Sequence, residues 1–153
     1  MATCNNKLRV DTVAPVNYSS IVIHNGVHIL LPNQKYHIYG IQSCVGLIIK
    51  KYNYNWNVEV GVGVHIELSN ASTTHFIHTN FTSNGIRILN DIFTIINNWD
   101  NNVPIEVEIM TDPENKCKAT DILVSKLKNW FNTLNFTDIQ YTNLKITNKS
   151  FVL

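Results

Sequence analysis

Residues 39–69 read YGIQSCVGLIIKKYNYNWNVEVGVGVHIELS. Two apolar, β-branched runs, Val45–Tyr52 and Trp56–Leu68, are separated by Asn- and Tyr-rich residues that are typical of a hairpin turn. The pattern predicts two adjacent antiparallel strands. Cys44 immediately precedes the first strand, and His65 lies near the end of the second. Because paired residues in an antiparallel ladder lie about 5 Å apart, we expect the hairpin to bring this cysteine and this histidine together.

The sequence on either side of the hairpin predicts more strands and two helices. Apolar residues at helical spacing indicate one helix near residues 84–99 and another near 120–134. Turn residues bound the expected strands, which are Ser20–Ile23, Val27–Leu31, Lys35–Ile41, Ile105–Met110, Ile139–Ile146 and Ser150–Leu153. In the first helix the expected apolar face consists of Ile86, Leu89, Ile92, Phe93 and Ile96.

This order of elements predicts an α+β fold. We expect a layered mixed β-sheet or sandwich with two helices packed on it. Residues 1–17 resemble no regular element and are predicted to form an N-terminal arm, which leaves 18–153 as a single domain. A chain of 153 residues is long enough for one domain with a substantial core.

The composition excludes several classes of partner. The chain has a net charge of +1 and 15% charged residues, with no basic run, so a nucleic-acid partner is not expected. It contains no apolar run of the roughly 18 residues that a membrane helix needs and no segment that resembles a signal peptide. Three cysteines at irregular spacing argue against a disulfide framework. We therefore expect a soluble monomer that is cytoplasmic in the producing cell.

Cys44 and His65 have the chemistry of a nucleophile and its base. The thiolate is the reactive form of cysteine, and a neighbouring imidazolium lowers the thiol pKa. Ser43 and Gln42 stand at a strand break, where unpaired backbone N–H groups could hold an oxyanion. The glycine-rich run before His65 would allow a substrate to approach closely. In the alternative interpretation Cys44 is a buried small hydrophobe and His65 is structural.

Two segments resemble a known family. Gly40–Val45 resembles the Gly-Leu-Gly-Ser-Cys-Val signature of the chemoreceptor glutamine deamidases, and Val64–Ser69 is similar to the Ala-His-x-x-Leu-Pro segment of that family, with His65 on its catalytic histidine. The same fold is shared by the cytotoxic necrotizing factor catalytic domain and by lethal-factor-type toxin deamidases. The resemblance implies a Cys44–His65 enzyme that converts a protein glutamine to glutamate, with no metal and no cofactor.

The chain also departs from the chemoreceptor enzymes. Gln42 replaces a glycine of the signature, and Ile38 stands where the family has a threonine six residues before the cysteine. The group that orients His65 must then come from elsewhere, and we expect it between Val13 and Leu31. The departures favour a toxin- or effector-like deamidase that acts on a host signalling or translation protein. We expect such an enzyme to be secreted or injected into the host cell without a signal peptide. The alternatives are a chemoreceptor-type deamidase, a transglutaminase, a papain-like protease, and a non-catalytic protein-binding module on the same fold.

Other residues complete the set of candidates. Tyr54 and Trp56, at the hairpin tip, could contact a substrate or could only frame one edge of the sheet. Ser69 and Asn70, which follow the His65 segment, are further candidates for substrate binding. His75 and His78 are three residues apart but have no third ligand nearby, so no metal site is expected. Cys4 and Cys117 lack a partner histidine and are expected to be bystanders.

Overall fold

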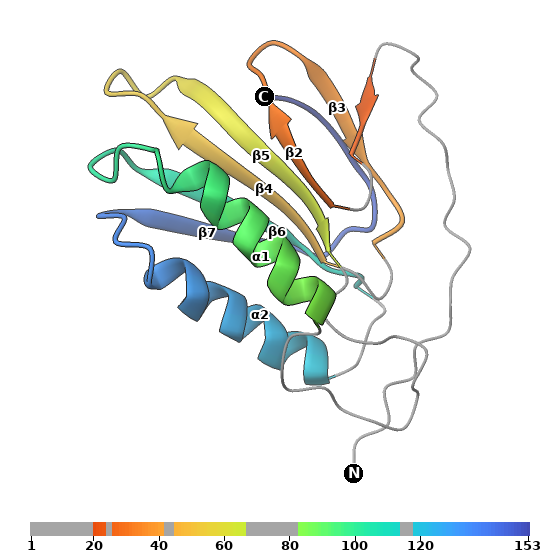
Figure 1. Cartoon of the computed structure of the whole chain (residues 1–153). Helices are drawn as coiled ribbons and strands as arrows, with labels where there is room; N and C mark the ends of the chain where they lie inside the picture. The colour runs from red at the N-terminus through yellow and green to blue at the C-terminus, as the bar shows by residue number, and fades with distance from the viewer. Residues whose placement is uncertain (1–19, 24–25, 42–44, 67–82, 114–117) are drawn as a thin grey trace.

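The central hairpin is formed by β4 (Val45–Tyr52) and β5 (Val58–Ile66), as the sequence predicts. The computed structural model describes residues 20–23, 26–41, 45–66, 83–113 and 118–153. The other strands are β1 (Ile21–Val22), β2 (Gly26–Leu30), β3 (Lys35–Ile38), β6 (Ile105–Met110), β7 (Ile139–Leu144) and β8 (Lys149–Val152), and the helices are α1 (Ser83–Ile96) and α2 (Lys118–Asn132). The fold is mixed α+β, with both helices packed against a sheet (Figure 1). The arm predicted over residues 1–17 lies outside the described residues.

Eight described strands divide into two sheets. The larger sheet has the order β2-β5-β4-β6-β7, and the smaller has the order β1-β3-β8. In the larger sheet only β6 and β7 are parallel, and α2 connects them. Parallel neighbours need such a crossover because a tight turn can join only antiparallel strands. The predicted mixed sheet is therefore confirmed, and a second sheet stands on its other face.

The helices cover one face of the five-stranded sheet. Strand alternation turns Leu47, Val64 and Val107 toward this face, where they join the buried core beneath the helices. Helix α1 contributes its own buried stripe, which is Gly85, Ile88, Leu89, Ile92 and Ile96. Figure 1 shows α1 and α2 on the same side of the sheet.

Two residues of α1 do not join this core, contrary to the prediction. Ile86 is 51% exposed and Phe93 is 44% exposed. At 3.6 residues per turn, both positions lie roughly 90° around the helix axis from the centre of the buried stripe. They therefore line the flank of α1 and leave apolar surface in contact with solvent.

The small sheet packs on the opposite face. Its core residues Ile23, Tyr36 and Ile38 pack against Ile48 and Met110 of the larger sheet. Lys149 of β8 reaches across and places its Nζ 3.0 Å from Glu108 Oε2. Glu108 is 7% exposed, and a carboxylate so deeply buried needs a partner of opposite charge. This ion pair joins the two sheets.

Because of local backbone geometry, β3 ends earlier and β5 begins later than the sequence predicts. Strand β3 ends at Ile38, short of the predicted Ile41, and Gly40 beyond it has a φ of 74°. Trp56 has a φ of 62°, so the strand predicted from Trp56 begins only at Val58. Residues in this left-handed region leave the extended conformation that a strand requires.

Candidate functional site

His65 lies on β5 with a glycine opposite it on both neighbouring strands. Gly46 of β4 is its partner on one side and Gly26 of β2 is its partner on the other. Paired residues direct their side chains to the same face of the sheet. Since Val64 and Ile66 belong to the core under the helices, the half-buried His65 is turned to the face that carries the small sheet. The two positions directly opposite His65 therefore carry no side chain.

The Gly26 side of His65 is open within the described part of the chain. Gly26 has a φ of 119°, which L side chains rarely adopt, and a Cβ built on it meets no atom of the described residues within 4 Å. The Gly46 side is filled, because a Cβ there would lie 3.1 Å from Ile38 Cδ1 and 3.2 Å from Ile41 Cδ1.

Ile38, which the resemblance sets at the position of a family threonine, packs in the second layer over Gly46. Its side chain is fully buried and has no hydrogen-bonding group. The source that we predicted for an orienting partner, residues 13–31, includes β2, which is hydrogen bonded to β5 beside His65. The identity of that partner stays a prediction.

Several predicted site residues lie outside the described residues. They are Gln42, Ser43, Cys44, Ser69 and Asn70, together with Cys4, His75, His78 and Cys117. The nearest described positions to Cys44 along the chain are Val45 and Gly46, and the register pairs these with Ile66 and His65.

The sequence predicts that the glycines of β5 leave room for a substrate, but the structure contradicts this for Gly61 and Gly63. A Cβ on Gly63 would lie 2.7 Å from Ile23 Cδ1, and a Cβ on Gly61 would lie 2.9 Å from Leu153 Cδ1. Side chains of the small sheet and its flanks therefore occupy the space over both glycines. Glycine within a strand commonly marks such a close approach between layers.

Tyr54 and Trp56 lie at the end of the hairpin that is far from His65. Strand β4 has eight residues, which at about 3.3 Å per residue span roughly 23 Å. Both rings are exposed, at 74% and 69%. The structure does not bring them together with His65, so a substrate held at His65 would have to extend along the whole strand to contact them.

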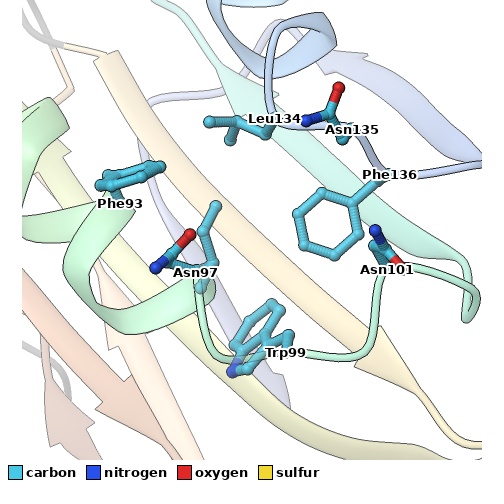
Figure 2. A pocket seen from close by; sticks show the side chains of 8 residues that line it. Phe93, Asn97, Trp99, Asn101, Leu134, Asn135 and Phe136 are labelled. Atoms are coloured by element: carbon cyan, nitrogen blue, oxygen red, sulfur yellow. The ribbon is translucent and has the colours of Figure 1, made fainter.

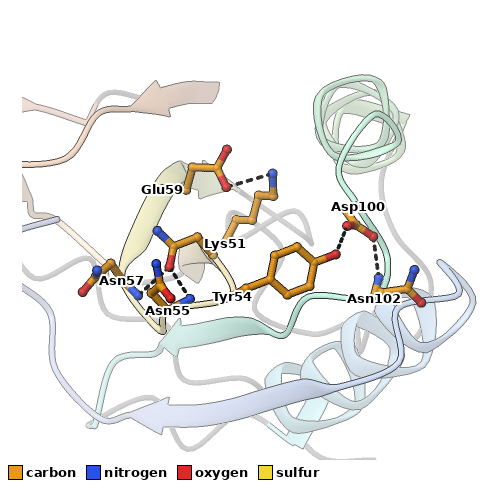
Figure 3. A network of polar contacts seen from close by, with 8 residues as sticks. Lys51, Tyr54, Asn55, Asn57, Glu59, Asp100 and Asn102 are labelled. Atoms are coloured by element: carbon orange, nitrogen blue, oxygen red, sulfur yellow. Dashed lines mark hydrogen bonds and ion pairs between the residues drawn. The ribbon is translucent and has the colours of Figure 1, made fainter.

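A polar network fixes this far end of the hairpin (Figure 3). The Tyr54 hydroxyl donates to Asp100 Oδ2 at 2.5 Å, and the Asn102 backbone N–H donates to Asp100 Oδ1 at 2.9 Å. The hydrogen bond to Asp100 raises the pKa of Tyr54, and the same bond lowers the pKa of Asp100. Lys51 Nζ lies 3.3 Å from Glu59 Oε2. The hairpin tip is thereby tied to the loop between α1 and β6.

His37 occupies an unusual position in the small sheet. Its Nδ1 is hydrogen bonded to the Ser150 hydroxyl, directly across the β3–β8 pair. Its Nε2 is buried and has no hydrogen-bond partner among the described residues. Burial lowers the pKa of His37.

This geometry predicts a loss of stability in acid. The folded state holds the proton of His37 less tightly than the unfolded chain, whose histidine pKa is 6.5. Protonation of His37 therefore favours the unfolded state, and stability is lost as the pH falls from 6.5 toward the lower pKa that His37 has in the folded protein. We expect the urea midpoint to fall between pH 7 and pH 5.5 and to fall less in His37→Asn, whose amide can still reach Ser150. Equal falls in the two proteins would contradict this expectation.

A cavity that the sequence did not predict lies near the same end of the molecule as the hairpin tip. It has a volume of about 140 Å³ and is lined by three aromatic, three asparagine and two aliphatic residues, which are Phe93, Trp99, Phe136, Asn97, Asn101, Asn135, Ile96 and Leu134. Figure 2 shows these side chains around a common space. We call it the helix-end pocket, because α1 ends just before Asn97 and α2 ends shortly before Asn135. In the sequence, Phe93 was the one residue that could have pointed to this pocket, but its helical spacing assigned it to the core.

Within the described ranges, no group of three or more His, Cys, Asp or Glu residues could hold a metal ion. No helix of the described chain is both long enough and apolar enough to span a bilayer. A scan against protein-family models finds no match, and searches of curated proteins and of solved structures find none either.

Proposed function

We propose that the protein is a Cys–His amidohydrolase that deamidates a glutamine side chain of a target protein. The observation that supports this proposal is the register of the hairpin, which pairs Gly46 with His65. Cys44 precedes Gly46 by two peptide units, which together span at most about 7 Å. A cysteine so close in the chain to the partner of a histidine is well placed to transfer its proton to that histidine.

The proposed reaction has two halves. The Cys44 thiolate attacks the carboxamide carbon, and backbone N–H groups at Cys44 and near Gln42 and Ser43 hold the resulting oxyanion. Collapse of this intermediate breaks the C–N bond, and the His65 imidazolium gives its proton to the departing ammonia. Water, deprotonated by His65, then attacks the thioester and releases glutamate and the thiolate. Each proton and electron pair is accounted for without a cofactor.

The surroundings of His65 favour a side chain as substrate. Within the described residues a Cβ built on Gly26 meets no atom within 4 Å, whereas a Cβ on Gly46 would lie 3.1 Å from Ile38 Cδ1 and 3.2 Å from Ile41 Cδ1. A glutamine side chain is long and narrow and can reach past the backbone of β2 to a half-buried histidine. Deamidation would add a negative charge to the target, which is enough to disturb a local electrostatic network. By resemblance, the target is a host signalling or translation protein and the enzyme is toxin- or effector-like.

Thiol reactivity tests the proposed pair without knowledge of the substrate. Cys44 should react with iodoacetamide at pH 7 faster than Cys4 and Cys117, because only Cys44 is expected to have a histidine nearby. In His65→Gln the rate at Cys44 should fall by about tenfold or more, since a thiol of ordinary pKa is only a few per cent ionised at neutral pH. Peptide mapping of the alkylated protein measures all three cysteines in one sample.

A matched control separates this effect from a general change in the fold. His37→Asn replaces a histidine of β3, a strand of the other sheet that does not pair with β5, and it should leave the rate at Cys44 within about twofold. If His65→Gln also leaves that rate unchanged, the Cys–His pair does not exist. The non-catalytic binding module would then be the better interpretation.

A further inference from the structure

The helix-end pocket carries three side-chain amides that come from two loops. Asn97 follows α1, Asn101 belongs to the loop before β6, and Asn135 belongs to the loop before β7. Among the described residues, none of these three side chains makes a hydrogen bond. Each amide offers one acceptor oxygen and two donor hydrogens. Several separate donors and acceptors therefore meet in one small space.

Three aromatic rings and the aliphatic side chains of Ile96 and Leu134 form the remaining walls. Phe93 is 44% exposed, and Trp99 and Phe136 are partly buried against the core beneath the helices. Figure 2 shows Phe93 on the α1 side, Phe136 opposite it and Trp99 below. Ligand pockets combine such apolar walls with a few polar groups that fix the orientation of the ligand.

The walls are held in place by hydrogen bonds that do not use the amides. Thr137 donates to the Asn101 carbonyl oxygen twice, from its backbone N–H at 3.0 Å and from its hydroxyl at 3.1 Å. The Trp99 backbone N–H donates to the Ile96 carbonyl at 3.0 Å. Asn135 has a φ of 61°, so a left-handed residue sets the path of the chain after α2. A site that is formed before the ligand arrives loses less entropy on binding.

Size and charge limit the ligand. A cavity of about 140 Å³ is close to the roughly 150 Å³ that accepts a benzene-sized ring in an engineered protein. None of the residues that line the pocket is charged, so a neutral ligand fits best. A purely apolar ring, such as a phenylalanine side chain, would cover the amides and leave their hydrogen bonds unmade, which is unfavourable.

We propose that the helix-end pocket binds one neutral pyranose ring. One face of a pyranose consists of C–H bonds that can pack on Phe93, Trp99 or Phe136, and its rim carries hydroxyl groups that can pair with Asn97, Asn101 and Asn135. The sugar is either a free monosaccharide or the terminal residue of a glycan. This inference is independent of the proposed deamidase activity, because the pocket lies near the end of the hairpin that is far from His65.

A titration followed by nuclear magnetic resonance on the full chain tests the proposal. The probes are the methyl glycosides of glucose, galactose, mannose and N-acetylglucosamine, and the signals are the Trp99 indole N–H and the three amide groups. At least one glycoside should cause saturable shifts at these signals, with a dissociation constant on the order of 1 mM, as expected for a small polar ligand. A disaccharide that ends in the same sugar distinguishes the sources, since equal or tighter binding indicates a glycan terminus and weaker binding a free sugar.

A pair of variants on α1 provides the control. Asn97→Ala should weaken binding about tenfold through the loss of one amide, whereas Asn90→Ala, an exposed residue of the same helix outside the pocket, should leave it unchanged. Both side chains are exposed, so both variants should keep the wild-type unfolding midpoint. The proposal is overturned if no glycoside binds at concentrations far above 1 mM. It is equally overturned if N-acetylphenylalanine amide binds there instead.

Discussion

Cys44→Ser is expected to lower the rate of deamidation by at least about 10³-fold while the fold remains intact. A hydroxyl is close in size to a thiol but ionises far less readily, so His65 would face a nucleophile that is almost never activated. The rate is measured on any target that the wild-type protein converts, by the mass difference between an amide and an acid. Circular dichroism and the unfolding midpoint check that the fold is unchanged.

Two other cysteines in the same chain give internal controls. Cys4→Ser and Cys117→Ser should keep the full wild-type rate, since no role in the reaction is proposed for either residue. If Cys44→Ser retained most of its activity, a thioester could not lie on the reaction path. The covalent mechanism would then fail, even if the protein still deamidated its target.

Phe131→Ala is expected to have the largest effect on stability, with a loss of about 3–5 kcal/mol in the free energy of unfolding. Phe131 of α2 is 0% exposed, and its ring packs edge-on against Trp130 at 4.9 Å and Tyr141 at 6.5 Å between centroids. Its removal leaves a cavity where α2 meets the sheet. Because domains of this size are stable by only about 5–15 kcal/mol, the variant would lie close to unfolding at 37 °C.

Urea unfolding measures this loss, and the same helix supplies a control. Asn129→Ala changes an exposed residue of α2 and should alter stability by no more than about 0.5 kcal/mol. A cost below about 1 kcal/mol for Phe131→Ala would mean that α2 does not pack on the sheet as described.

The sequence predicts the individual elements of this fold better than their assembly. Alternation and helical spacing are local properties, so β4, β6 and α1 appear close to their expected positions. Pairing between strands depends on contacts distant in the chain, and no local pattern indicates that β1, β3 and β8 form a sheet of their own. The glycines of β5 illustrate this limit, since their spacing is visible in the sequence but the side chains that fill the space above them are not.

The candidate site was predictable only in part for the same reason. The hairpin pattern indicates that residues near Cys44 and His65 approach each other, and the pairing of Gly46 with His65 agrees with that expectation. The open side at Gly26 depends on β2, which belongs to a separate part of the sequence. The helix-end pocket combines loops that follow two different helices, and its asparagines do not stand out in a chain rich in asparagine.

The pairing of β3 with β8 has a consequence for synthesis on the ribosome. His37 and Ser150, which face each other in this pair, are 113 residues apart. At about 5–20 residues per second, β3 emerges on the order of ten seconds before its partner strand. During that interval the nascent chain lacks Leu153, which later covers Gly61, so this part of the central hairpin stays unprotected. Chaperones that bind exposed apolar strands are expected to hold the chain at this stage, and codon changes that slow translation after β7 should lengthen that hold.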